Sequence, residues 1–191
     1  MENIELEHTS PNHLRSVRDV QIQDAQSRVI DRIRADPARA RSTITTSGRV
    51  NEGLVCEVRQ GKFRTVMDLG RAMGGDASAP SPGFFGRAAI AGCVAIAIKM
   101  LAAREGLHFI AVDVDVETDF DDAAIFGIGS TSAAPLDTRL TIAIETNEAE
   151  TRVSDVVDRA LEADPWFLAL RDPQVVTRQV STRWAGRVID P

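Results

Sequence analysis

A long, almost entirely apolar segment that carries one cysteine constrains this chain more than any other feature. The segment begins with Ser81, a good helix N-cap followed by a proline suited to the first helical position, and it ends at Gly106. Two charged residues, Arg87 and Lys99, interrupt its interior. A helix that is apolar nearly all round is normally buried. The sequence therefore predicts a helix through the centre of the fold, and its thiol, Cys93, lies in the middle.

Size and composition restrict the class of protein. The 191 residues are 43% hydrophobic and 26% charged, as in an ordinary soluble domain with room for a core. The net charge of -6 argues against nucleic acid as a partner, because non-specific binding needs a basic surface. The acidic start lacks the apolar stretch of a signal peptide, and the segment between Arg87 and Lys99 is too short to span a bilayer. We therefore expect a cytoplasmic protein with no membrane partner.

Hydrophobic periodicity divides the chain into an N-terminal segment, residues 1–40, and a main domain, residues 41–191. The N-terminal segment is expected to hold a loose tail over residues 1–12 and then one helix that ends before the Asp36-Pro37 pair. The main domain is expected to hold an antiparallel three-stranded meander, the central helix, two more strands, a second helix and a last strand. These elements are predicted at 41–49, 54–59, 63–69, 81–106, 108–117, 140–144, 147–161 and 175–177, and Asn147 is the predicted cap of the second helix.

The two cysteines each allow two interpretations. Most buried cysteines act as small hydrophobic residues, whereas a reactive one needs a cationic or hydrogen-bonding partner that favours the thiolate. Cys93 stands between these alternatives, with small neighbours that leave room for a substrate. Cys56 lies on the apolar face of its strand, which favours a core role. A disulfide between them requires Cα atoms within about 7 Å.

The sequence predicts no metal or cofactor site. The acidic run over residues 113–122 lacks the glycine and the glutamate that a calcium loop requires at its sixth and twelfth positions. His8, His13 and His108 do not show the spacing of metal ligands. A solvated strand face explains the alternating acidic residues, and no phosphate-binding or dinucleotide-binding motif is present.

Three short motifs follow one another in the middle of the chain: Gly74-Gly75-Asp76, Pro80-Ser81-Pro82 and Ala91-Gly92-Cys93-Val94. Together with the order of the elements over roughly residues 41–181, they resemble the OsmC/Ohr family of osmotically inducible and organic hydroperoxide resistance proteins. The resemblance implies an α+β fold in which antiparallel sheets surround a buried central helix. It also implies an intertwined homodimer with two active sites at the subunit interface.

The same resemblance implies roles for individual residues. Members of known activity are thiol peroxidases, in which one cysteine attacks the hydroperoxide and a second cysteine resolves the sulfenic acid as a disulfide. Cys93 matches the attacking cysteine, and Arg49 matches an arginine that holds the thiolate. The resolving Cys-Pro pair is Asp164-Pro165 in this chain, and the glutamate that also holds the thiolate is Gly83.

Three functional hypotheses follow from this pattern. In the first, the protein is a one-cysteine hydroperoxide reductase in oxidative-stress defence, and an external thiol reductant or Cys56 reduces the sulfenate at Cys93. In the second, it is a non-catalytic member that binds an apolar small molecule at the dimer interface, because the second cysteine and the glutamate are missing. In the third, it is a redox sensor whose dimer packing changes when Cys93 is oxidised.

Overall fold

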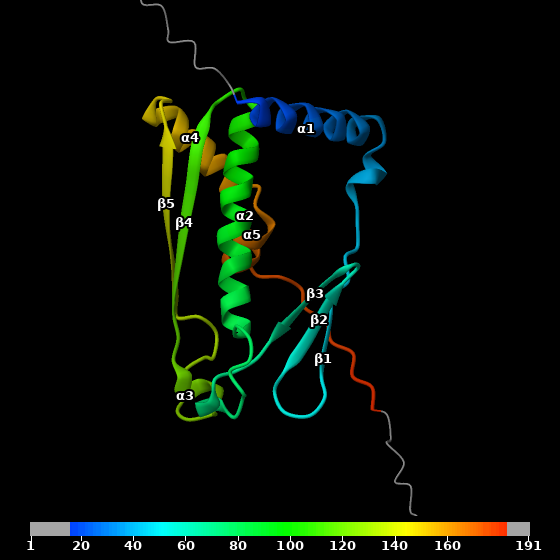
Figure 1. Ribbon diagram of the computed structural model, residues 1–191, viewed down its shortest axis with the longest axis vertical. Helices are drawn as coiled ribbons and strands as arrows, with labels where there is room; N and C mark the ends of the chain where they lie inside the picture. Colours follow the sequence, from blue (N-terminus) through cyan, green and yellow to red (C-terminus); the bar gives the residue numbers. More distant parts are fainter. Residues whose placement is uncertain (1–15, 183–191) are drawn as a thin grey trace, which may run out of the picture.

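The computed structural model describes residues 16–182 of the chain, and the predicted tail over residues 1–12 lies outside them (Figure 1). In chain order the elements are α1 (Val17–Ala35), a 3-10 turn (Pro37–Ala40), β1 (Ser47–Val50), β2 (Cys56–Gln60), β3 (Phe63–Met67), a 3-10 turn (Arg71–Met73), α2 (Pro82–Arg104), β4 (Phe109–Asp119), α3 (Asp122–Ile125), β5 (Asp137–Thr146), α4 (Glu150–Leu161) and α5 (Pro165–Arg171). The predicted mixture of helices and antiparallel strands around a long central helix is confirmed.

Helix α2 starts and stops where the sequence places its signals. The Ser81 hydroxyl accepts a hydrogen bond from the backbone N–H of Phe84, and Pro82 occupies the first turn. The chain leaves the helix through Gly106, whose φ of +80° favours glycine. By length and hydropathy alone α2 could cross a membrane. Its main packing partners in the described chain are β4, α1, α4 and α5.

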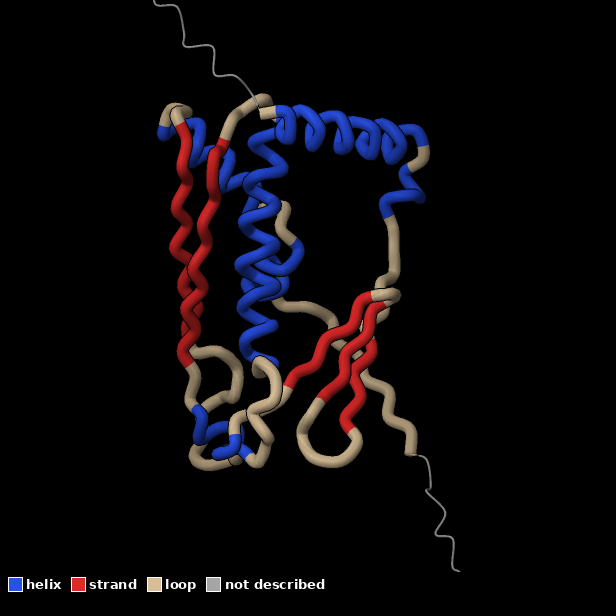
Figure 2. Tube along the Cα trace, viewed as in Figure 1, coloured by secondary structure: helices blue, strands red, loops and turns tan. Residues whose placement is uncertain are grey.

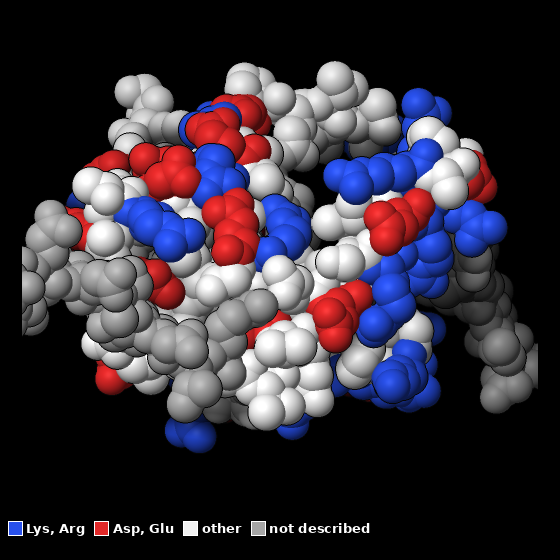
Figure 3. Space-filling model, turned by 90° about the horizontal axis from the view of Figure 1, so that it is seen from above, with Lys and Arg blue, Asp and Glu red and all other residues white. Residues whose placement is uncertain are grey.

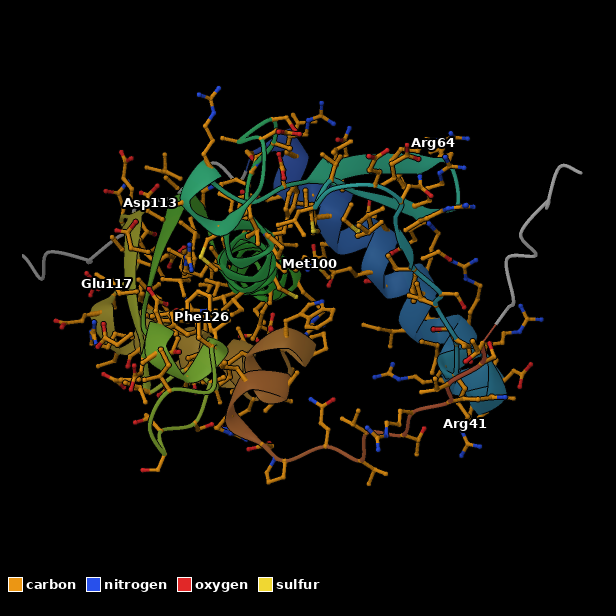
Figure 4. The ribbon with its side chains drawn as sticks, turned by 90° about the horizontal axis from the view of Figure 1, so that it is seen from below. Arg41, Arg64, Met100, Asp113, Glu117 and Phe126 are labelled. Atoms are coloured by element: carbon orange, nitrogen blue, oxygen red, sulfur yellow. The ribbon has the colours of Figure 1, made fainter. Side chains whose placement is uncertain are left out.

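The core lies where α2 meets β4, β5 and α4. Strands β4 and β5 form an antiparallel pair with Val114 opposite Ile142, and their inner side chains face α2. Acidic residues of β4, among them Asp113 and Glu117, alternate with these and lie on the outer face (Figure 4). The fully buried apolar side chains are those of Val94, Ile98, Phe109 and Val156, together with Leu107 and several alanines.

Helix α1 is attached to this core by a buried ionic cluster. The carboxylate of Asp19, which is completely buried, lies 3.0 Å from Lys99 Nζ on α2 and 2.5 Å from His108 Nδ1 before β4. Burial alone would raise the pKa of Asp19, but hydrogen bonds with His108, Lys99 and Ser16 outweigh it and hold that pKa below its usual value. The predicted N-terminal helix is therefore confirmed, and it packs on α2.

Strands β1, β2 and β3 form the predicted antiparallel meander, with Val58 opposite Thr65. The first strand is shorter than predicted and begins at Ser47. This sheet stands apart from the layer formed by α2, β4 and β5 (Figure 2). Lys and Arg side chains gather towards the side of the molecule that holds this sheet and the end of α1 (Figure 3).

The structure corrects three sequence predictions. Helix α4 begins after Ala149 instead of Asn147, and the predicted strand over residues 175–177 is an extended segment whose Val175 is 96% exposed. Helix α2 is not buried all round in the single chain, because Ile96 is 60% exposed and Met100 lies on the side away from β4 (Figure 4). An apolar pattern shows that a surface needs cover, but it does not show which chain covers it.

Candidate functional site

The thiol of Cys93 lies against a carboxylate. Its side chain is half-buried on α2, and it hydrogen-bonds with Asp164 and with the backbone N–H of Trp166. Burial raises the pKa of the Cys93 thiol, and Asp164 raises it further by accepting a hydrogen bond from the S–H group and by its negative charge. The Trp166 N–H acts in the opposite direction but does not compensate. Burial and the carboxylate of Asp164 therefore both favour the protonated thiol over the thiolate.

Asp164 is fixed in this place by the start of helix α5. Its Oδ1 accepts hydrogen bonds from the backbone N–H groups of Trp166 and Phe167, at 3.0 and 2.7 Å, and Pro165 occupies the first helical position. The side chain is completely buried, and its Oδ2 has no hydrogen-bond partner among residues 16–182. The residue at the expected resolving position thus does lie beside Cys93, as a helix cap.

Helix α5 was not predicted from the sequence, and the role of Asp164 as its N-cap was therefore missed as well. The signal was present, since an Asp-Pro pair is typical of a helix start, with aspartate as N-cap and proline at the first position. The helix has only seven residues, Pro165–Arg171, and is too short for a clear apolar period.

The structure does not bring Arg49 to Cys93 within one chain. Arg49 lies on β1 and is exposed, and its Nε donates to Asn51 Oδ1 at 2.8 Å. No hydrogen bond or ion pair of the described residues joins it to the thiol. A role for Arg49 at Cys93 stays a prediction that needs a second subunit.

Cys56 is a free, half-buried thiol on β2 of the three-stranded sheet. A Cβ atom on Gly48, on the neighbouring strand, would lie 3.3 Å from the Cys56 sulfur. The sheet is not among the main packing partners of α2. The single chain therefore gives no support to a disulfide between Cys56 and Cys93.

The first turns of α2 carry Gly83, where a glutamate was expected, and Arg87, whose side chain lies over this glycine. A Cβ atom on Gly83 would lie 3.4 Å from Arg87 Nη1, so the guanidinium runs back along the helix across this glycine. Arg87 is half-buried. At position 83, where the resemblance implies a glutamate, the chain thus has no side chain, and the guanidinium of Arg87 lies beside the glycine.

Two adjoining cavities flank this end of α2. The larger, of ≈520 Å³, is lined by residues 134–138, Leu140 and three side chains of α5, which are Phe167, Leu170 and Arg171. The smaller, of ≈140 Å³, is lined by Gly83, Gly86, Arg87 and Ile90 of α2 and by Thr118 and Phe120 at the end of β4. Both share Pro135, Thr138 and Leu170. We call the two together the α2–α5 groove.

The Gly-Gly-Asp motif shapes the loop that leads into α2. The buried carboxylate of Asp68 accepts hydrogen bonds from the backbone N–H groups of Leu69, Asp76 and Ser78 and from the Ser78 hydroxyl. The bonds from Ser78 are the main reason that the pKa of Asp68 is lowered. A Cβ atom on Gly75 would lie 2.1 Å from the Leu69 carbonyl oxygen, so this position requires glycine. Among residues 16–182, no cluster of three metal-binding side chains is present.

Comparisons with known proteins agree with this architecture. The family model of OsmC-like proteins matches residues 75–177, which is more than half of the chain. An OsmC-like protein from Mycoplasma pneumoniae is similar in structure, with a TM-score of 0.58, 14% identity and coverage of 68% of this chain and 88% of that one. A Vibrio cholerae protein described as an organic hydroperoxide resistance protein, with captopril in one active site, has a TM-score of 0.50, 15% identity and coverage of 68% and 85%. No curated protein matches the sequence. From the family match and the shared fold, the chain belongs to the family of OsmC-like proteins.

Proposed function

We propose that this OsmC-like protein binds an apolar small molecule in the α2–α5 groove and that Cys93 is held as an unreactive thiol. The observation that carries the proposal is the contact between Cys93 and Asp164, which raises the pKa of the thiol. Peroxide reduction needs a thiolate, and a buried carboxylate beside the sulfur opposes its formation. Asp164 also stands where a resolving cysteine was expected, so no second thiol is supplied there.

The α2–α5 groove has the character of a small-molecule site. Ile90, Phe120, Leu170 and Phe167 give it apolar walls, with a few polar groups among them. Ligand pockets usually combine such apolar walls with a few polar groups that fix orientation. The groove runs beside α5, whose first residues contact Cys93, so the groove and the thiol share one helix as their wall.

We further propose that the protein is a homodimer and that it is cytoplasmic. Ile96 and Met100 leave an apolar side of α2 exposed in the single chain. Exposed apolar patches on a central helix favour cover by another subunit. A second copy that placed its three-stranded sheet there would also bring Arg49 towards the site, as the resemblance implies.

A second candidate function is slow hydroperoxide reduction by Cys93 alone, and the same thiol–carboxylate contact gives it a chemical route. Asp164 accepts the thiol proton while the sulfur attacks the outer oxygen of the hydroperoxide and the O–O bond breaks. The proton then passes to the leaving alkoxide, so that Cys93-SH and ROOH become Cys93-SOH and ROH. Two equivalents of an external thiol reductant would restore Cys93 and release water and a disulfide.

Ligand titration and peroxide treatment of the full-length protein separate the two candidates. Calorimetric titration with a neutral apolar probe, 1-decanol, is expected to show saturable binding, whereas the peroxide consumed with excess dithiothreitol is expected to match the Cys93→Ser variant. Absence of decanol binding together with turnover that requires Cys93 would replace the binding function with the reductase function.

A further inference from the structure

One cation in the α2–α5 groove has no partner in the described chain. Arg87 is half-buried and lines the smaller cavity, yet it makes no hydrogen bond or ion pair with any other residue of 16–182. The second arginine of the groove, Arg171, is different, because it bonds to Glu162 at 2.6 Å and to Asp172 at 2.8 Å. The carboxylate of Asp137, which also lines the larger cavity, pairs with Arg139 at 2.6 Å. Arg87 is therefore the one charged side chain of the groove without a counter-charge among residues 16–182.

The space next to Arg87 is open because residue 83 has no side chain. The guanidinium lies across Gly83, with Nη1 3.4 Å from the place where a Cβ atom would be. A glutamate at that position would have supplied the counter-charge from within the helix. Because it is missing, both the guanidinium and the volume beside it are available to a ligand. Partly desolvated guanidinium groups favour carboxylates, which they bind with two parallel hydrogen bonds.

The rest of the groove is built for an apolar tail. Ile90, Phe120 and Leu170 surround the smaller cavity, and Phe167 continues the apolar wall into the larger one. A molecule with one carboxylate and an alkyl chain would match both parts, with its charge at Arg87 and its chain along α5. A free inorganic anion would leave the apolar part unfilled, and a neutral lipid would leave Arg87 unpaired.

We infer that the α2–α5 groove selects apolar carboxylates of the fatty-acid class and that Arg87 binds their carboxylate. This inference rests on the proposed function, in which the groove binds an apolar molecule, and it adds the chemical class of the ligand. Charge-assisted hydrogen bonds to a guanidinium correspond to roughly ten- to a hundredfold in affinity.

The test compares decanoate with 1-decanol, which have chains of equal length and differ in the charged group. Calorimetric titrations at neutral pH would use the full-length wild type, Arg87→Gln and the control Arg104→Gln, which removes an exposed arginine at the other end of α2, outside the groove. The wild type and Arg104→Gln are expected to bind decanoate at least about tenfold more tightly than decanol. Arg87→Gln is expected to lose this preference and to keep its affinity for decanol, which also reports that the groove is intact.

The outcomes distinguish failure of the inference from failure of the proposed function. Equal binding of the two probes by the wild type, or a decanoate preference that survives in Arg87→Gln, overturns the carboxylate assignment and leaves a groove for neutral apolar molecules. Failure of the wild type to bind either probe overturns both. Loss of decanol binding in Arg87→Gln with a retained thermal midpoint would make Arg87 a wall of the groove and would also overturn its role as the carboxylate partner.

Discussion

The carboxylate of Asp164 caps helix α5 and, from the same position, accepts a hydrogen bond from the Cys93 thiol. One residue thus orders the polypeptide after α4 and sets the charge state of the cysteine on α2. This link explains why the position expected to hold a resolving cysteine carries an aspartate: the helix start is preserved, while the redox partner is not. It also gives the chain a thiol that resists ionisation within an OsmC-like fold.

Replacing Asp164 by asparagine is predicted to make Cys93 more reactive. Asparagine is about as good an N-cap as aspartate, so α5 is expected to remain, while the negative charge beside the sulfur is lost. The pKa of Cys93 falls, and its rate of alkylation by iodoacetamide at pH 7 is expected to rise several-fold. Alkylation rates between pH 6 and 10, followed by mass spectrometry in a Cys56→Ser background, would show the shift.

The control for this prediction is Asp172→Asn at the other end of α5, where the carboxylate pairs with Arg171. It is expected to leave the pH profile of Cys93 unchanged. An identical profile for Asp164→Asn and the parent protein would mean that Asp164 does not govern the thiol.

The buried cluster of Asp19, Lys99 and His108, which holds α1, is predicted to make the free energy of unfolding decrease at acidic pH. The pKa of Asp19 is lower in the folded chain than in the unfolded chain, so its contribution is present above about pH 4 and is lost as the pH falls through the folded value. Asp19→Asn removes the charge and is expected to cost about 2 kcal/mol at pH 7, because Lys99 and His108 retain partial access to water.

Urea unfolding of the wild type, Asp19→Asn and the exposed control Asp24→Asn at pH 3 to 7 would test the cluster. The difference between wild type and Asp19→Asn should shrink as the pH falls below about 4, whereas Asp24→Asn should follow the wild type throughout. A constant difference at all pH values would contradict the assigned ionic role.

Two glycines of the loop before α2 are predicted to differ sharply in their tolerance of alanine. Gly75→Ala places a Cβ atom against the backbone carbonyl of Leu69, and this clash with backbone is expected to cost about 2 kcal/mol or more. Gly70→Ala has no atom within 4 Å of the new Cβ and a φ of -65°, so a change within about 0.5 kcal/mol is expected. Thermal unfolding of both variants checks the pair, and equal destabilisation would argue against the loop geometry.

The proposed homodimer predicts a specific effect of charge on α2. Ile96→Glu places a carboxylate in the exposed apolar side of the helix and is expected to shift the protein from dimer to monomer. Val176→Glu, on the exposed segment after α5, is expected to leave the assembly unchanged. Sedimentation velocity over a range of concentrations measures the oligomeric state of both variants, and a wild type that stays monomeric would show that the protein is not a homodimer.

Much of the fold could be predicted from local signals, because Ser81, Pro82 and Gly106 mark the ends of α2 and alternation marks β2 to β5. The α2–α5 groove could not be predicted, since its walls come from residues 83–90, 118–120, 134–140 and 167–171, which only the tertiary fold brings together. The position of Asp164 beside Cys93 followed from the family resemblance, but its part in capping α5 needed the structure.

Whether Cys93 is unreactive is decided by intact-mass spectrometry of the full-length protein after one equivalent of an organic hydroperoxide at pH 7, with and without dimedone. Because Asp164 and burial disfavour the thiolate, the masses of the wild type and of Cys93→Ser are both expected to stay unchanged. A dimedone adduct that appears in the wild type and disappears in Cys93→Ser would contradict this expectation and would establish Cys93 as a peroxidatic thiol.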